Sequence, residues 1–123
     1  MKKKKVIPYT RVGSLIQAQA GNSLYEQEQL IRKHCEEQGH EIVEVIHDFP
    51  NSKCFNPKYQ DLLKRISEGK VHCDFLIATR PDRFSRKAGQ AIIIHQELIK
   101  YDVLACVLPP PMKKEIKTNF FEL

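Results

Sequence analysis

Two kinds of hydrophobic pattern alternate along this chain. Short apolar runs of strand length occur at Lys5 to Val12, Glu41 to Asp48, Asp74 to Thr79 and Val103 to Leu108. Between them, in residues 23–38, 57–68 and 88–99, apolar positions recur every three or four residues, as they do on the buried face of a helix. Strands that alternate with helices predict a parallel sheet joined by right-handed crossovers.

Local signals define where two of the helices begin and end. Ser23 opens the first helix at capping-box spacing from a glutamate, and Gly39 follows its end. Asn56 offers a capping side chain for the second helix and Pro57 has a φ already suited to a first turn, while Gly69 ends the pattern. We therefore expect both helices to have sharp boundaries.

Finer expectations concern the strand edges and the buried helix faces. Pro8 removes a backbone donor from the first strand, which favours an edge position or a bulge. Helical spacing directs Ile31 and Cys35 of the first helix towards a core, and Ile92 and Leu98 of the last. The three prolines at 109–111 end the fourth strand, because proline cannot continue a ladder.

The chain is therefore predicted to be an α/β domain of three layers, with a mostly parallel sheet of four or five strands and helices on both faces. Its 123 residues suit one domain. We expect this domain to span residues 1–108 and a short tail to occupy residues 109–123, without a separate DNA-binding domain.

Charge and cysteine content narrow the function only slightly. The net charge of +5 favours an acidic partner, nucleic acid first, although the lysines at 2–5 contribute much of it. The four cysteines include no CxxC pair, which favours reduced thiols in a cytoplasmic protein over a metal site or a disulfide scaffold. No apolar stretch approaches the ~20 residues of a membrane helix.

Arginines gather where two predicted strands end. Arg80, Arg83 and Arg86 follow the third strand, and Arg11 lies at the end of the first. The carboxyl ends of parallel strands meet at one edge of a sheet, so these guanidinium groups can converge on an anion such as phosphate, which arginine binds bidentately. The alternative, equally open from spacing alone, is a set of separate surface arginines with Asp82 paired to one of them.

Three segments together resemble a known family. Tyr9-Thr10-Arg11-Val12, Ser23-Leu24-Tyr25-Glu26-Gln27 and Asp82-Arg83-Phe84-Ser85-Arg86 occur in the order and rough spacing of the catalytic domain of serine recombinases, the resolvase and invertase family. The resemblance runs from about Val6 to Leu108.

The resemblance implies a resolvase-like fold and DNA strand cleavage and rejoining through a phosphoserine, without metal or cofactor. Arg11, Arg83 and Arg86 would stabilise the scissile phosphate, with Asp82 as the carboxylate that orients them. Gln17 matches a polar active-site position in the same family.

Two departures and the length of the chain modify this expectation. Gly13 stands where the family carries its nucleophilic serine, so we expect an impaired enzyme whose only local substitute is Ser14. Asn56 stands where the family usually has an arginine. Family members also continue into a long helix and a DNA-binding module, so DNA affinity should be weak, non-specific and salt-dependent.

Two other interpretations remain open. The chain could be a non-catalytic regulatory module of a mobile element, which binds DNA, forms a homodimer or pairs with an intact recombinase subunit. A phosphatase or nucleotide-binding domain is less consistent with the sequence, because no Gly-rich GxxxxGK[ST] loop is present.

Overall fold

The computed structural model describes residues 3–11, 23–49, 56–79 and 88–108. The elements run along the chain as β1 (Lys5–Arg11), α2 (Ser23–Gln38), β2 (Glu41–Ile42), β3 (Ile46–Asp48), α3 (Pro57–Ser67), β4 (Phe75–Ala78), α4 (Ala88–Ile99) and β5 (Leu104–Val107). Within the described residues, five parallel strands form a sheet in the order β2-β1-β4-β5, with β3 also paired to β1. The predicted three-layer α/β fold is confirmed.

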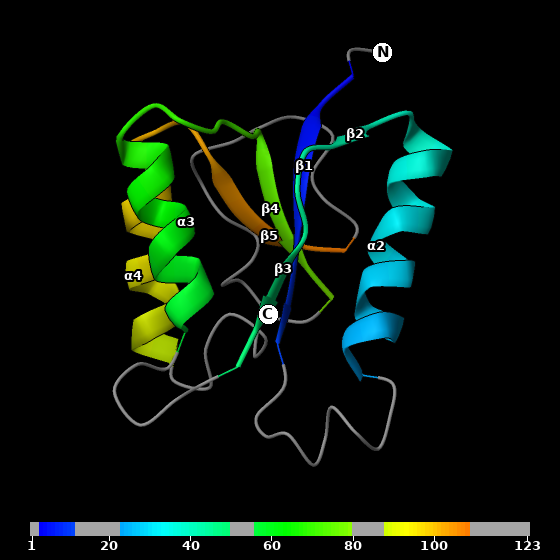
Figure 1. Ribbon diagram of the computed structural model, residues 1–123, viewed down its shortest axis with the longest axis horizontal. Coiled ribbons are helices and arrows are strands. Elements are labelled where there is room, and N and C mark those ends of the chain that lie inside the picture. Colours follow the sequence, from blue (N-terminus) through cyan, green and yellow to red (C-terminus); the bar gives the residue numbers. More distant parts are fainter. Residues whose placement is uncertain (1–2, 12–22, 50–55, 80–87, 109–123) are drawn as a thin grey trace.

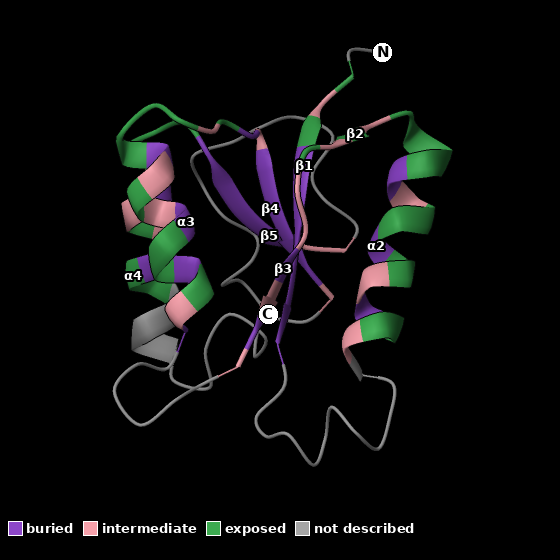
Figure 2. Ribbon diagram, in the orientation of Figure 1, coloured by how far each residue is buried: buried purple, intermediate pink, exposed green. Residues whose placement is uncertain are grey.

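Helices cover both faces of the sheet, as Figure 1 shows. On one face, beneath α2, the strands contribute Val6, Phe75 and Leu104, which pack with Ile31 and Cys35 of the helix. Successive side chains of a strand point to opposite faces, so the next residue of each strand belongs to the other face. Figure 2 shows that the central strands are buried while each helix keeps an exposed outer side.

The second face lies beneath α3 and α4. Ile7, Leu76 and Ala105 come from the strands, and they pack with Tyr59 and Leu62 of α3 in one cluster. All five of these residues are fully buried. Two separate apolar layers therefore hold the sheet, one on each side.

Pro8 lies in an interior strand beside a bulge, so the edge position expected as one alternative is wrong and the bulge expected as the other is present. It is buried in β1, in register with Ile77 of β4. The carbonyl oxygen of Val6 accepts a hydrogen bond from Val43 N on the β2 side, and backbone groups alternate in direction along a strand, so Pro8 turns its missing donor to that same side.

The β2 side is interrupted beside Pro8. Ile42 pairs with Val6 and Ile46 with Tyr9, so three residues on this side stand opposite two in β1. The extra residue makes a bulge, which divides the strand expected over residues 41–48 into β2 and β3. The missing N–H group of Pro8 therefore interrupts no backbone hydrogen bonding between paired strands.

The ends of α2 and α3 agree with the prediction from the sequence, whereas the buried face of α4 differs from it. Gly39 and Gly69 both have φ of +74°, the left-handed conformation that glycine adopts most readily after a helix. In α4, Ile94 and Leu98 are buried, whereas Ile92 is 42% exposed. The expectation that Ile92 faces the core is therefore wrong.

Candidate active site at the carboxyl ends of β1 and β4

The crossover connections change direction between β1 and β4: the chain passes from β1 to one side of the sheet and from β4 to the other. These two strands are neighbours in the sheet, and the helices that follow them, α2 and α4, lie on opposite faces. In open α/β sheets, such a switch point leaves a crevice beyond the carboxyl ends of the two strands, where ligands bind. The segments that carry the predicted arginines follow these two strands.

Arg11 is the last residue of β1 and is only 3% exposed. Its backbone N–H donates to Gln27 Oε1 at 3.1 Å, and Gln27 Nε2 donates to the Arg11 carbonyl oxygen at 3.2 Å. Gln27 is itself buried, in the first turns of α2. The last residue that β1 pairs with β4 is Pro8, so Gln27 supplies the donor and acceptor that a neighbouring strand would have offered to Arg11.

Asp48 lies beside Arg11 at the end of β3 and is fully buried. Its Oδ2 accepts hydrogen bonds from the Tyr9 hydroxyl at 2.8 Å and from Tyr59 N at 3.0 Å. Its Oδ1 accepts from Lys58 N at 3.0 Å and from its neighbour Phe49 N at 3.1 Å. The carboxylate therefore satisfies two free N–H groups in the first turn of α3, where the helix dipole also favours negative charge.

Tyr9 connects Asp48 to Arg11 electrostatically. Its pKa is raised well above the usual value, first by burial and then by the charge and hydrogen bond of Asp48, while the positive charge of Arg11 acts in the opposite direction. The hydroxyl thus stays protonated and acts as a donor. Tyr9 and Arg11 alternate with Thr10, so both point to the face of the sheet that α3 and α4 cover.

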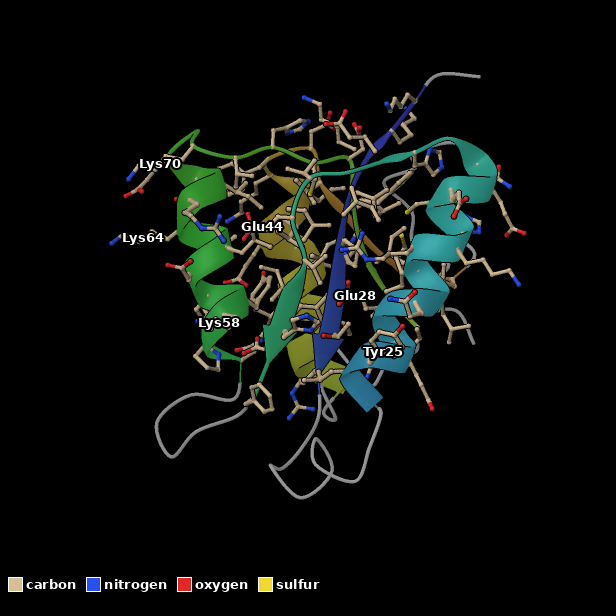
Figure 3. All side chains as sticks on the ribbon, turned by 45° about the vertical axis from the view of Figure 1, so that its right-hand side comes forward. Tyr25, Glu28, Glu44, Lys58, Lys64 and Lys70 are labelled. Carbon is tan, nitrogen blue, oxygen red and sulfur yellow. The ribbon has the colours of Figure 1, made fainter. Side chains whose placement is uncertain are left out.

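The opposite face at the same strand ends carries a second polar group. Thr10 Oγ1 lies 2.7 Å from His47 Nδ1, and His47 Nε2 lies 3.2 Å from Glu28 Oε1 of α2. Glu28 also pairs with Arg32 one turn later in the helix. Figure 3 shows Glu28 beside the lower ends of β1 and β3. These contacts hold α2 against the carboxyl ends of β1 and β3, next to Gln27.

Asn56 does not cap α3 with its side chain, so that expectation is wrong. No side-chain capping bond comes from Asn56, and its Oδ1 instead accepts from Gln60 Nε2 at 3.4 Å. Asp48 caps the helix from a distant position in the sequence. The local Asn-Pro pattern locates the start of the helix correctly but assigns the cap to the wrong side chain.

Of the predicted site residues, Arg11 alone lies within the described part of the chain. The segments that contain the others, Ser14, Gln17, Arg80, Asp82, Arg83 and Arg86, lie outside the described residues. Among the described strands, β1, which ends at Arg11, and β4, which precedes the other arginines in the sequence, are adjacent and parallel.

Sequence reasoning missed the roles of Gln27 and Asp48. Gln27 belongs to a segment that resembles the recombinase family, which was the available signal for its importance. Asp48 had a weaker signal, as an acid at the carboxyl end of a strand. Its partners Tyr9 and Tyr59 are 39 and 11 residues away in the sequence, so spacing does not reveal them.

Metal and membrane features were also searched in residues 3–11, 23–49, 56–79 and 88–108. No group of three or more histidine, cysteine, aspartate or glutamate side chains is placed to hold a metal ion there. Among the helices of the same residues, none combines the length and apolarity that crossing a membrane requires.

The fold and the position of the site define the catalytic domain of a serine recombinase. Residues 6–114 match the family described as "Resolvase, N terminal domain". The chain therefore belongs to the resolvase family, as the resemblance predicted. Among curated proteins, none matches it.

Solved structures agree with this assignment. A resolvase family site-specific recombinase from Streptococcus pneumoniae is 27% identical, with a TM-score of 0.73 over 86% of this chain and 72% of that one. The N-terminal catalytic domain of TP901-1 integrase is 25% identical, with a TM-score of 0.69 over 85% of this chain and 77% of that one. The C-terminal catalytic domain of ISC1926 TnpA, an IS607-like serine recombinase, shares the fold at 20% identity and a TM-score of 0.68, over 89% of this chain and 73% of that one.

Proposed function

We propose that this domain binds a DNA phosphodiester at the carboxyl ends of β1 and β4 through Arg11, Arg83 and Arg86, and that its cleavage chemistry is weakened by Gly13. The observation that supports this proposal is the switch point between the adjacent, parallel strands β1 and β4, because ligands of open α/β sheets bind beyond the carboxyl ends of such strands and Arg11 ends β1. Arg80, two residues after the end of β4 in the sequence, would add a further contact to the DNA backbone.

The surroundings of Arg11 support a functional role for its charge. A buried guanidinium costs free energy unless it is paired, so a position such as this one is seldom retained for solubility. Gln27 fixes the backbone at Arg11, and Asp48 lies next to it in the sheet. Such fixed positive charge, arranged before the reaction, is what stabilises the extra negative charge of a phosphoryl-transfer transition state.

The proposed reaction needs a hydroxyl nucleophile. The oxygen of Ser14 would attack the phosphorus and form a phosphoserine bond to the 5′ side of the DNA. The bond from phosphorus to the 3′ oxygen breaks, the serine proton is lost, and the 3′ oxygen takes up a proton. Asp82 would orient the arginines, and Gln17 would contribute a polar contact nearby. No cofactor enters this scheme.

The alternative is a non-catalytic module that occupies DNA without cutting it. The sequence observation that favours it is Gly13 at the position of the nucleophile, because glycine has no oxygen to attack with. Under either proposal the domain acts in the cytoplasm with weak, salt-dependent DNA affinity, as a homodimer or together with another recombinase subunit.

A cleavage assay on supercoiled plasmid separates these proposals. The chain would be compared with Ser14→Ala, Gly13→Ser and Gly13→Ser combined with Arg11→Gln, and covalent protein–DNA adducts would be resolved on denaturing gels. We expect a trace of adduct or none from the unchanged chain, a clear gain from Gly13→Ser, and loss of that gain when Arg11 is replaced.

Each result of this assay has a definite meaning. An adduct from the unchanged chain that Ser14→Ala removes identifies Ser14 as the nucleophile. If Gly13→Ser gives no adduct while salt-sensitive DNA binding persists and depends on Arg11, the non-catalytic alternative is correct. DNA binding that Arg11→Gln leaves unchanged, with no adduct from any variant, refutes the phosphate site altogether.

A further inference from the structure

A groove lies between α3 and α4, on the outer side of these two helices. It has a volume of about 380 Å³ and is lined by Gln60, Leu63, Lys64, Ser67, Glu97, Lys100 and Tyr101. This volume falls within the ~300–1,000 Å³ range typical of ligand pockets. The residues of α4 that line it belong to the last turn of the helix and the turn after it, so the groove lies towards the amino ends of the strands, away from the proposed DNA site.

Two lysines of the groove form no ion pair with the acidic side chains of the described residues. Lys64 and Lys100 are exposed, and within the described residues neither forms an ion pair. Arg65 of the same helix, by contrast, pairs with Glu44 at 2.7 Å and with Asp61 at 3.1 Å. In Figure 3, Lys64 projects away from the sheet, into the space outside α3.

Among the described residues that line the groove, Glu97 is the only acidic one, and its carboxylate is hydrogen-bonded to the protein interior. The hydroxyl of the buried Tyr59 donates to Glu97 Oε1 at 3.0 Å. The bond raises the pKa of Tyr59, after the larger effect of burial, so the hydroxyl remains a donor. Glu97 is thus engaged with the interior, which leaves the two ammonium groups available to an incoming carboxylate.

Apolar surface accompanies this charge. Leu63 is partly buried against the core, and Tyr101 remains 39% exposed. Gln60 adds hydrogen-bonding capacity, as does Ser67, whose hydroxyl donates to the Lys64 carbonyl at 2.7 Å and can still accept a bond. The groove therefore presents two ammonium groups together with apolar and aromatic side chains.

We propose that this groove is a docking site for an acidic segment of a partner protein, with carboxylates on Lys64 and Lys100 and an apolar side chain against Leu63 and Tyr101. Charge complementarity favours an acidic ligand. A peptide fits better than duplex DNA, because a uniform phosphate backbone has no apolar side chain to place against Leu63 and Tyr101. The proposal does not depend on the chemistry at the strand ends.

The test uses a defined peptide and matched variants. An acetylated nine-residue peptide of alternating glutamate and leucine would be titrated into the isotope-labelled full chain, with its glutamine-for-glutamate counterpart and a 20-base-pair duplex as competing probes. We expect the amide signals of Gln60, Leu63 and Tyr101 to shift with the acidic peptide. Lys64→Glu combined with Lys100→Glu should weaken its binding by about tenfold or more, since each interfacial ion pair contributes modestly.

Lys33→Glu is the control, because it reverses one lysine charge, as each of the two groove substitutions does, on an exposed position of α2 across the sheet from the groove. Its affinity for the peptide should stay within about twofold of the unchanged chain, and the urea midpoints of all variants should agree. Equal binding of the glutamine peptide, equal weakening by Lys33→Glu, or no binding of the acidic peptide would overturn the proposal. Displacement of the peptide by the duplex would reassign the groove to nucleic acid.

Discussion

Replacing Asp48 by alanine should strongly destabilise the domain. The buried carboxylate accepts four hydrogen bonds, from Tyr9, Phe49, Lys58 and Tyr59. Loss of a helix N-cap costs about 0.5–2 kcal/mol. Loss of the buried hydrogen bond from the Tyr9 hydroxyl costs about 1–3 kcal/mol more. The expected loss of about 1.5–5 kcal/mol is a large part of a total stability that amounts to about 0.05–0.15 kcal/mol per residue.

Urea denaturation followed by circular dichroism measures this loss. With a slope of about 1–3 kcal/mol per M, the midpoint of Asp48→Ala should fall by about 1 M or more. Asp61→Ala is the matched control, because its acid lies on α3 with a side chain that is 64% exposed, and it should cost no more than about 1 kcal/mol.

A double-mutant cycle with Tyr9→Phe tests the mechanism itself. In the unchanged chain this substitution removes a donor to a charged acceptor and should cost about 1.5–3 kcal/mol. In the Asp48→Ala background it should cost less, because the hydrogen bond to Asp48 is already absent there. Equal costs of Tyr9→Phe in both backgrounds, or an Asp48→Ala chain as stable as Asp61→Ala, would refute the role assigned to the carboxylate.

Two further predictions concern Gln27 and His40. Gln27→Glu should cost about 1–3 kcal/mol in urea denaturation, because a carboxylate oxygen would face the Arg11 carbonyl, whereas the same change at the exposed Gln29 should be close to neutral. Burial lowers the pKa of His40, and the neighbouring His34 and Lys4 lower it further. The unfolded chain therefore binds more protons than the folded one at pH values between that lowered pKa and about 6.5. Stability should therefore be highest above this window and fall as the pH decreases through it, and His40→Gln should flatten the dependence of the urea midpoint on pH; an unchanged slope would exclude His40 as its source.

The sheet could be predicted from the sequence because its strands are buried on both faces. Runs such as Phe75 to Ala78 are apolar at every position, which requires helices on both sides. The ends of α2 and α3 could also be predicted, because Gly39 and Gly69 end these helices through their own left-handed backbone conformation. These features depend on a few adjacent residues and so appear in the local pattern.

Features that depend on distant partners could not be predicted in this way. The position of Pro8 in the interior depends on a bulge across from it, which only the register of two strands reveals. The choice of Asp48 over Asn56 as the cap of α3 depends on where β3 ends relative to the helix. The exposure of Ile92 depends on how α4 is rotated against the sheet.

The proposed site was predictable in part for the same reason. Arg11 was found because it follows a clear strand, and the later arginines because they follow another. The sequence predicted that these strand ends share one edge of the sheet, but not that the two strands are neighbours, which the strand order establishes. Gln27 and Asp48 gain their roles only once the strand ends are in place.

The pairing of Gln27 with the backbone of Arg11 has a consequence for engineering. It joins the exit from the first strand to the entry of the first helix, 16 residues apart, without using any of the intervening chain. Segments of other lengths and compositions could therefore be spliced between these two residues while the backbone of Arg11 keeps its place. A library of such inserts, each with a hydroxyl at a different offset, would turn the domain into a scaffold on which new phosphoryl-transfer activity can be selected.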